Sequence, residues 1–181
     1  MTYHSLREFI KYLESEGELI RVTGRVSPVL EITEITDRIS KEPGGGKALL
    51  FENVEGSTMP VLINAFGSYK RICMALGITN IESIGQDIDH YLKLVPPENF
   101  MDKVMLLPML LEASNFPPKI VGKQHALCQE VIHTGDAVNL GMLPILQCWP
   151  DDAGRFITFP MVINRSLDRR IRNVGLYRMQ V

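Results

Sequence analysis

The stretch RNVGLYRMQV, residues 172–181, keeps the apolar spacing of a strand but breaks the local rules of a core strand. Asparagine and glycine are poor strand formers, and Arg178 needs a partner among its apolar neighbours. Such violations are expected where a protein binds something, although an ordinary strand remains an equal alternative on this pattern alone. Residues 155–164 precede it across a polar turn, 165–170. We expect these two segments to pair as antiparallel strands.

The last residues of the sequence are apolar and lack a turn signal. Val174, Leu176 and Val181 would leave their sheet without the partners that bury both faces of a strand. We therefore expect the sequence to be a piece of a longer chain.

Helical and strand patterns alternate before residue 115. Apolar residues at a period of 3.6 predict helices, and short apolar runs bounded by turn residues predict strands. The Pro96-Pro97 pair separates the last two helices. The helices are expected over 5–16, 29–40, 68–76, 81–94 and 99–111, and the strands over 18–22, 48–54 and 60–66, the last two as a hairpin.

The character of the sequence changes after Phe116-Pro117-Pro118. Residues 119–121 and 128–133 suit strands, and residues 135–143 suit a loop or a short helix. We expect a domain change near residue 115, with a mixed α/β domain over 1–115 and a second domain over 116–181. The fold class is therefore predicted as α+β.

Composition excludes several classes of protein. The chain has 181 residues, 45% hydrophobic and 22% charged, as globular proteins do. A net charge of −2 with dispersed basic residues gives no footprint for nucleic acid. The first residues contain no apolar stretch of signal-peptide length, and no run reaches the ~18 apolar residues of a membrane span, so we expect a cytoplasmic protein.

The cysteines and histidines give little support for a disulfide framework or a metal site. Cys73, Cys128 and Cys148 are odd in number and lack a C-x-x-C spacing, so we expect small core residues. His125 and His133 flank Cys128 at a spacing that fits no standard zinc pattern, and a role without metal is favoured.

Two further patterns have ordinary explanations. Gly44-Gly45-Gly46-Lys47 differs from a phosphate-binding loop because Lys41 and Ala48 replace its glycine and hydroxyl residue. The loop also follows a helix and leads into a strand, so a flexible connector is favoured. The basic residues of the polar turn are explained by a solvated loop; they are Arg165, Arg169, Arg170 and Arg172.

Several stretches together resemble the UbiD family of carboxy-lyases, which are decarboxylases. The similarity runs in order along the whole sequence and covers about the first third of a typical member. The matching stretches are Leu49–Val54, Asn64–Ser68, Leu143–Ile145, Cys148–Gly154, Ile157-Thr158 and Arg172–Val181.

The resemblance implies a fold, a set of cofactors and site residues. An amino-terminal α/β domain would be followed by a flavin-reductase-like split β-barrel that holds prenylated FMN, and residues 116–181 would be its first portion. Asn173 matches a ligand to a divalent metal, usually manganese, and potassium is a further candidate ion; an amide oxygen suits such hard cations. Leu176, Tyr177 and Arg178 match the stretch that lines the flavin. Arg178 also matches the arginine that members place beside the substrate carboxylate and the acidic catalytic residues.

The implied reaction is decarboxylation of an aromatic or α,β-unsaturated acid, with a 4-hydroxybenzoate-type quinone precursor as a candidate. Arg178 would hold the carboxylate by a forked contact, and an acid would return a proton to the same carbon. That acid, its partner glutamate, and a His and a Glu that bind the metal lie downstream in the family and are absent here. We therefore expect this chain alone to be inactive.

The resemblance also implies a flavin prenyltransferase as the source of the cofactor, and it leaves a homo-oligomer open. Two other functions remain open: a non-catalytic assembly domain, and an FMN-dependent reductase with a related barrel. A period of two places Asn173 and Arg178 on opposite faces of a regular strand. We expect a bend or bulge at Gly175 to reconcile their roles.

Overall fold

The computed structural model of the protein describes residues 3–92, 100–114, 117 and 120–181. It divides into two compact units. The first contains residues 1–81 and 139–181, and the second contains residues 82–138. The expected break at Pro96-Pro97 lies outside the described residues.

A three-stranded sheet organises the first unit, with strand order β1-β2-β3. β1 (Leu19–Val26) pairs parallel with β2 (Ala48–Val54), and β2 pairs antiparallel with β3 (Val61–Ile63). A parallel pair needs a long crossover, and α2 (Glu31–Ser40) supplies it. The predicted hairpin of β2 and β3 is confirmed.

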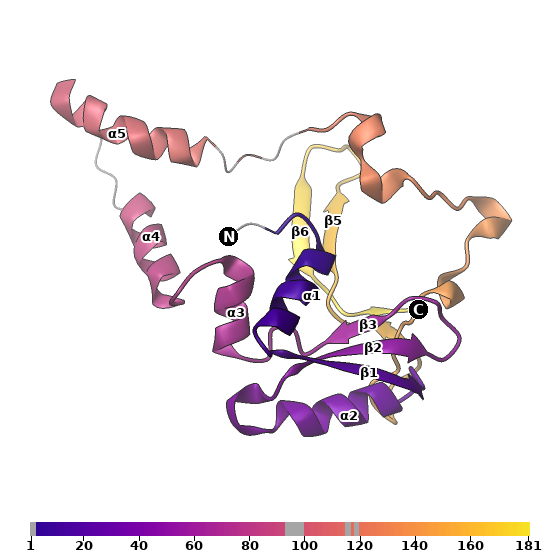
Figure 1. Ribbon diagram of the computed structural model, residues 1–181. Coiled ribbons are helices and arrows are strands. Elements are labelled where there is room, and N and C mark those ends of the chain that lie inside the picture. The colour runs from indigo at the N-terminus through magenta and orange to yellow at the C-terminus, as the bar shows by residue number, and fades with distance from the viewer. Residues whose placement is uncertain (1–2, 93–99, 115–116, 118–119) are drawn as a thin grey trace. The chain divides into compact units, whose positions relative to one another are not determined.

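Helices cover both faces of this sheet (Figure 1). Leu49 and Phe51 of β2 pack with Ile32 of α2, whereas Ala48 packs with residues of α1 (Leu6–Ser15) on the opposite face. The alternation follows from the period of two along a strand. Because both faces of β2 are covered, this strand is apolar in consecutive positions, and the mixed α/β class is confirmed.

Serine residues fix where two helices of this unit begin. The Ser5 hydroxyl accepts a hydrogen bond from the Glu8 amide at the start of α1. The Ser68 hydroxyl accepts one from the Arg71 amide at the start of α3 (Tyr69–Leu76). Each cap satisfies a backbone donor that the first helical turn leaves free.

The later part of the first unit contains four short strands in two antiparallel pairs. β4 (Phe156–Ile157) pairs with β7 (Met179–Gln180), and β5 (Met161–Arg165) pairs with β6 (Arg172–Leu176). The predicted antiparallel pairing of these segments is confirmed. A short 3₁₀ helix, η5 (Leu140–Met142), lies in the range expected as loop or short helix. The split β-barrel stays a prediction, because these strands form two two-stranded sheets.

The expected interruption between Asn173 and Arg178 does not take the form of a bulge at Gly175. The register of β5 and β6 runs without a shift from Met161↔Leu176 to Arg165↔Arg172, through Gly175. β6 ends after Leu176, and the break before β7 therefore falls at Tyr177-Arg178. The glycine has another physical reason: a Cβ at this position would lie 2.6 Å from the Tyr177 ring.

The regular elements that the structure describes in the second unit are all helical. The unit contains α4 (Glu82–Leu92), α5 (Phe100–Ala113) and three 3₁₀ turns. These turns are η2 (Lys123–His125), η3 (Leu127–Gln129) and η4 (Gly135–Ala137). None of the described helices has the length and apolar character needed to cross a membrane.

Two expectations for this unit are wrong. The described residues of 119–121 are not in a strand, and η3 with irregular backbone occupies the expected strand at 128–133. A short apolar run becomes a strand only beside a partner strand, and the described part of this unit offers none.

The expectation that all three cysteines are core residues is wrong for one of them. Cys128 is exposed rather than in the core, whereas Cys73 and Cys148 are half-buried.

Candidate functional site

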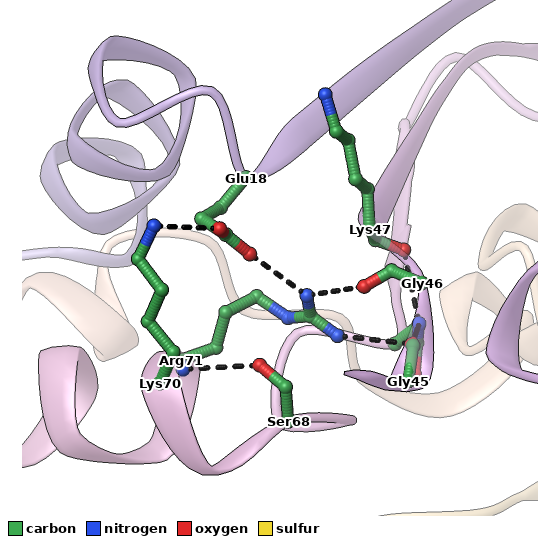
Figure 2. Close-up of polar contacts among 8 residues, drawn as sticks. Glu18, Gly45, Gly46, Lys47, Ser68, Lys70 and Arg71 are labelled. Carbon is green, nitrogen blue, oxygen red and sulfur yellow. Dashed lines mark hydrogen bonds and ion pairs between the residues drawn. The ribbon is translucent and has the colours of Figure 1, made fainter. Parts of the chain in front are cut away.

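The most deeply buried charge in the described residues is Arg71, near the start of α3 (Figure 2). Its Nη1 donates to the Glu18 carboxylate at 3.0 Å and to the Gly46 carbonyl at 2.5 Å, and its Nη2 donates to the Gly45 carbonyl at 3.3 Å. Lys70 Nζ donates to the same Glu18 carboxylate at 2.7 Å. The hydrogen bond from Lys70, followed by that from Arg71, lowers the pKa of Glu18.

The glycine loop is held by these contacts. Gly45 and Gly46 use their carbonyl oxygens as acceptors, whereas a phosphate-binding loop offers backbone N–H donors. Both have positive φ, and a Cβ would lie 1.9 Å from the Gly67 oxygen and 2.0 Å from the Ile39 oxygen, respectively. The connector is therefore confirmed, but it is a tightly packed one rather than a flexible one.

Arg178 forms a forked ion pair with Asp152. Nη1 donates to Oδ1 at 3.0 Å, and Nη2 donates to Oδ2 at 2.6 Å. The guanidinium carbon lies 3.8 Å from the centroid of the Phe156 ring, a cation–π distance. The hydrogen bond from Arg178 lowers the pKa of Asp152, which favours the ionised form of this carboxyl.

The Asp152 carboxylate is itself fixed by the backbone. The Trp149 amide donates to Asp152 Oδ2 at 3.2 Å, and the Asp152 amide donates to the Trp149 carbonyl at 3.1 Å. The second bond closes a turn in which Pro150 takes a position that suits its fixed φ. The side chain of Asp152 is 11% exposed and that of Arg178 is 40% exposed, so the pair is anchored on the aspartate side and open on the arginine side.

Asn173, Leu176 and Tyr177 lie on or directly after β6. Asn173 Nδ2 donates to Tyr177 Oη at 3.1 Å, which leaves the amide oxygen of Asn173 as an acceptor. The side chains of Asn173, Leu176 and Tyr177 are exposed. The strand thus presents a neutral oxygen, an apolar group and an aromatic ring to the surroundings.

Among the predicted residues, the structure brings Asn173 into contact with Tyr177, whereas Arg178 pairs with Asp152, which was not predicted. No hydrogen bond among the described residues joins one pair to the other. Sequence reasoning missed Asp152 and Phe156. The requirement of Arg178 for a partner was a signal, but sequence could not choose between Asp151 and Asp152.

The described residues contain no group of three or more His, Cys, Asp or Glu side chains that could hold a metal ion. Asn173 is thus a single candidate ligand, which fits a metal only as one part of a larger set. The arginines of the polar turn are exposed, as a solvated loop requires.

Two family models match the chain in order. The N-terminal domain of 3-octaprenyl-4-hydroxybenzoate carboxy-lyase matches residues 10–88, and the Rift-related domain of the same carboxy-lyase matches residues 119–181. The chain belongs to the UbiD family.

Relatives of this UbiD-family chain are found in both bacteria and archaea. An uncharacterized protein of Aquifex aeolicus (strain VF5) is 52% identical over 99% of the chain and 36% of its own length. An uncharacterized protein of Archaeoglobus fulgidus is 48% identical over 100% of the chain and 36% of its own length. The chain therefore spans about a third of the length of these relatives.

Solved structures of UbiD-class enzymes share its fold. An evolved dimeric form of HmfF from Pelotomaculum thermopropionicum, in complex with prFMN, is 31% identical with a TM-score of 0.69, over 98% of this chain and 36% of that one. The vanillic acid decarboxylase of Sedimentibacter hydroxybenzoicus, in its open form, is 28% identical with a TM-score of 0.77, over 100% of this chain and 35% of that one.

Proposed function

We propose that the full-length protein, the complete product of the gene that encodes this sequence, is a prenylated-FMN-dependent decarboxylase. Its substrate would be an aromatic or α,β-unsaturated carboxylic acid, with a 4-hydroxybenzoate-type quinone precursor as one candidate. The observation that carries the proposal is the ordered match of both UbiD family models, together with a related enzyme of known structure in complex with prFMN.

Residues of this chain have the chemical groups that suit the flavin and a metal ion. Leu176 and Tyr177 offer exposed apolar and aromatic surface, which suits contact with a flavin ring. The Asn173 amide oxygen suits a hard divalent cation such as manganese or a potassium ion, completed by ligands from outside the described residues. When bound, the prenylated flavin supplies the electron sink for decarboxylation.

Arg178 is assigned to the substrate carboxylate. A guanidinium carries five N–H donors, and the fork on Asp152 engages one from each Nη, so further donors remain. Asp152 holds the guanidinium by the forked ion pair, and the partly exposed side chain can receive a second carboxylate. The substrate is thereby held with its carboxylate at Arg178 while CO2 leaves.

The proposal also includes partners. The cofactor would come from a flavin prenyltransferase, because prenylated FMN is a modified flavin that another enzyme must make. The proposal includes a homo-oligomer for the full-length protein, and its support is the likeness to HmfF, of which an evolved form is dimeric.

Two alanine variants of the full-length protein test the division of roles. Asn173→Ala should lower the flavin and metal retained on purification, because it removes a cation ligand. Arg178→Ala should lower CO2 release at least about 10²-fold while much of the flavin stays bound, because it removes a charged donor at the reacting group. Flavin absorbance, metal content and CO2 release are measured on each variant.

Matched controls lie in the same hairpin. Asn164 pairs directly with Asn173 in the β5–β6 register, and Arg172 is an exposed arginine of β6, so Asn164→Ala and Arg172→Ala should retain both flavin and activity. Equal loss of flavin in Asn173→Ala and Arg178→Ala would contradict the division of roles. Hydride transfer from a nicotinamide cofactor without CO2 release would instead indicate a reductase, and a protein that purifies without flavin would indicate an assembly domain.

A further inference from the structure

The contacts of Arg178 divide its guanidinium into an occupied edge and a second edge. Asp152 occupies the edge formed by Nη1 and Nη2, through two parallel hydrogen bonds. The Phe156 ring lies against one face of the group, and the side chain of Cys148 also interacts with it. Within the part of the chain that the structure describes, Asp152 is the one carboxylate that pairs with Arg178. The edge that includes Nε therefore has no carboxylate partner there.

The Asp152 side of the pair is built to stay in place. Its carboxylate accepts the Trp149 amide, its own amide closes the turn at the Trp149 carbonyl, and its side chain is 11% exposed. A carboxylate held by its own turn does not need the arginine to define its position. The arginine, by contrast, is a long side chain with many rotamers, and a ring contact on one face leaves its rotation open.

We propose that Asp152 is a positioning residue that holds Arg178 by its Nη1–Nη2 edge, so that the second edge, which includes Nε, binds the carboxylate of the substrate. The inference rests on the proposed decarboxylase function and adds a residue to it. Asp152 acts through Arg178 and does not touch the substrate.

A role for Asp152 as a competitor of the substrate predicts a change in carboxylate affinity of the opposite sign. If Asp152 were an internal competitor for Arg178, a substrate carboxylate would have to displace it, and removing it would tighten carboxylate binding. If Asp152 positions Arg178, removing it weakens binding, because the guanidinium must then be ordered by the ligand itself. The sign of the change in affinity separates the two roles.

The experiment measures binding of benzoate and of its neutral analogue benzamide to the flavin-loaded full-length protein by calorimetry, with CO2 release in parallel. Asp152→Ala should weaken benzoate binding about tenfold, the loss of part of a charge-assisted forked contact, and leave benzamide binding unchanged. Asp152→Asn keeps one acceptor oxygen and the turn, so it should recover part of that loss. The rise in KM and the fall in kcat should both be larger in Asp152→Ala than in Asp152→Asn.

Controls separate positioning from folding and from failure of the proposed function. Asp151→Ala makes the same change one residue away at an exposed aspartate and should match the wild type. If Asp152→Ala does not fold, as its melting temperature reports, Asp152→Asn carries the test. Unchanged or tighter benzoate binding in a CO2-releasing enzyme overturns the inference alone, whereas a wild type that neither binds benzoate nor releases CO2 overturns the proposed function and the inference together.

Discussion

Strands β2 and β6 belong to the same unit but are stabilised in different ways. In β2, Ala48, Leu49, Leu50 and Phe51 are all buried, with helices on both faces of the sheet. In β6, every residue is exposed except the half-buried Gly175. The first strand is defined by burial of apolar surface, and the second by its pairing with β5 and by a few polar contacts.

The energetic consequence follows from what each strand buries. A fully buried apolar side chain contributes about 1.5–3 kcal/mol, so β2 supplies a large share of the stability of the unit. An isolated two-stranded hairpin is marginal in water. The later segment is anchored near its beginning, where Leu146 joins the core and Gln147 exchanges backbone hydrogen bonds with Pro28 and Leu30. The site residues follow this anchor on exposed strands.

The largest predicted effect concerns activity and tests whether the exposed region is sufficient. This 181-residue chain, given prenylated FMN and manganese, should show no decarboxylase activity. Asn173 offers one neutral oxygen, too few ligands for a metal site, and the lack of a positioned proton donor alone costs about 10²–10⁴ in rate. The measurement is CO2 release from a panel of aromatic and acrylic acids, with the full-length protein as control. Turnover within about tenfold of that control would show that the catalytic residues have been misplaced.

The second prediction tests the buried ion pair of the well-packed region. Glu18→Gln should destabilise the chain by roughly 3 kcal/mol, because it removes the carboxylate partner of a buried guanidinium. The value lies at the low end for buried pairs, since the Gly45 and Gly46 carbonyls still accept from Arg71. Denaturant unfolding measures the change. Glu14→Gln is the matched control: Glu14 pairs with Arg21 at the surface, so this variant should stay near the wild type.

The effect of Glu18→Gln on stability should also depend on pH. The pKa of Glu18 is lowered in the folded protein, chiefly by the hydrogen bond from Lys70, so its contribution is complete above the ordinary glutamate pKa of 4.5. It is lost as pH falls from that value through the lowered folded pKa. Unfolding curves below pH 4.5 should therefore converge for the wild type and Glu18→Gln. A gap that stays constant through this range would rule out the carboxylate as the source.

The elements with strong local patterns were predictable from sequence. The helices around Leu13 and Ile32 and the strand at 48–54 have apolar periodicities that match their buried faces. The expected strands at 119–121 and 128–133 failed because strand formation depends on a neighbouring strand, which a local pattern does not reveal.

The site was predictable in part. The need of Arg178 for a partner was visible in the sequence, but the choice of Asp152 depends on a turn that positions one of two adjacent aspartates. Gly175 was correctly marked as unusual and wrongly explained, since ring packing by Tyr177 can be seen only in three dimensions. The roles of Asn173 and Leu176 rest on resemblance to the UbiD family and stay predictions.

The smallest predicted effect compares one substitution in the two regions. Ile163 on β5 is 61% exposed, so Ile163→Ala should cost less than about 1 kcal/mol in this chain, mainly through lost strand propensity. Ile32 on α2 is 0% exposed, and the same substitution there should cost about 2–5 kcal/mol by leaving a cavity in the core. Denaturant unfolding of both variants at several protein concentrations makes the comparison. Similar losses for the two would mean that β5 is covered in solution, and a loss for Ile163→Ala that grows with concentration would identify self-association as the cover.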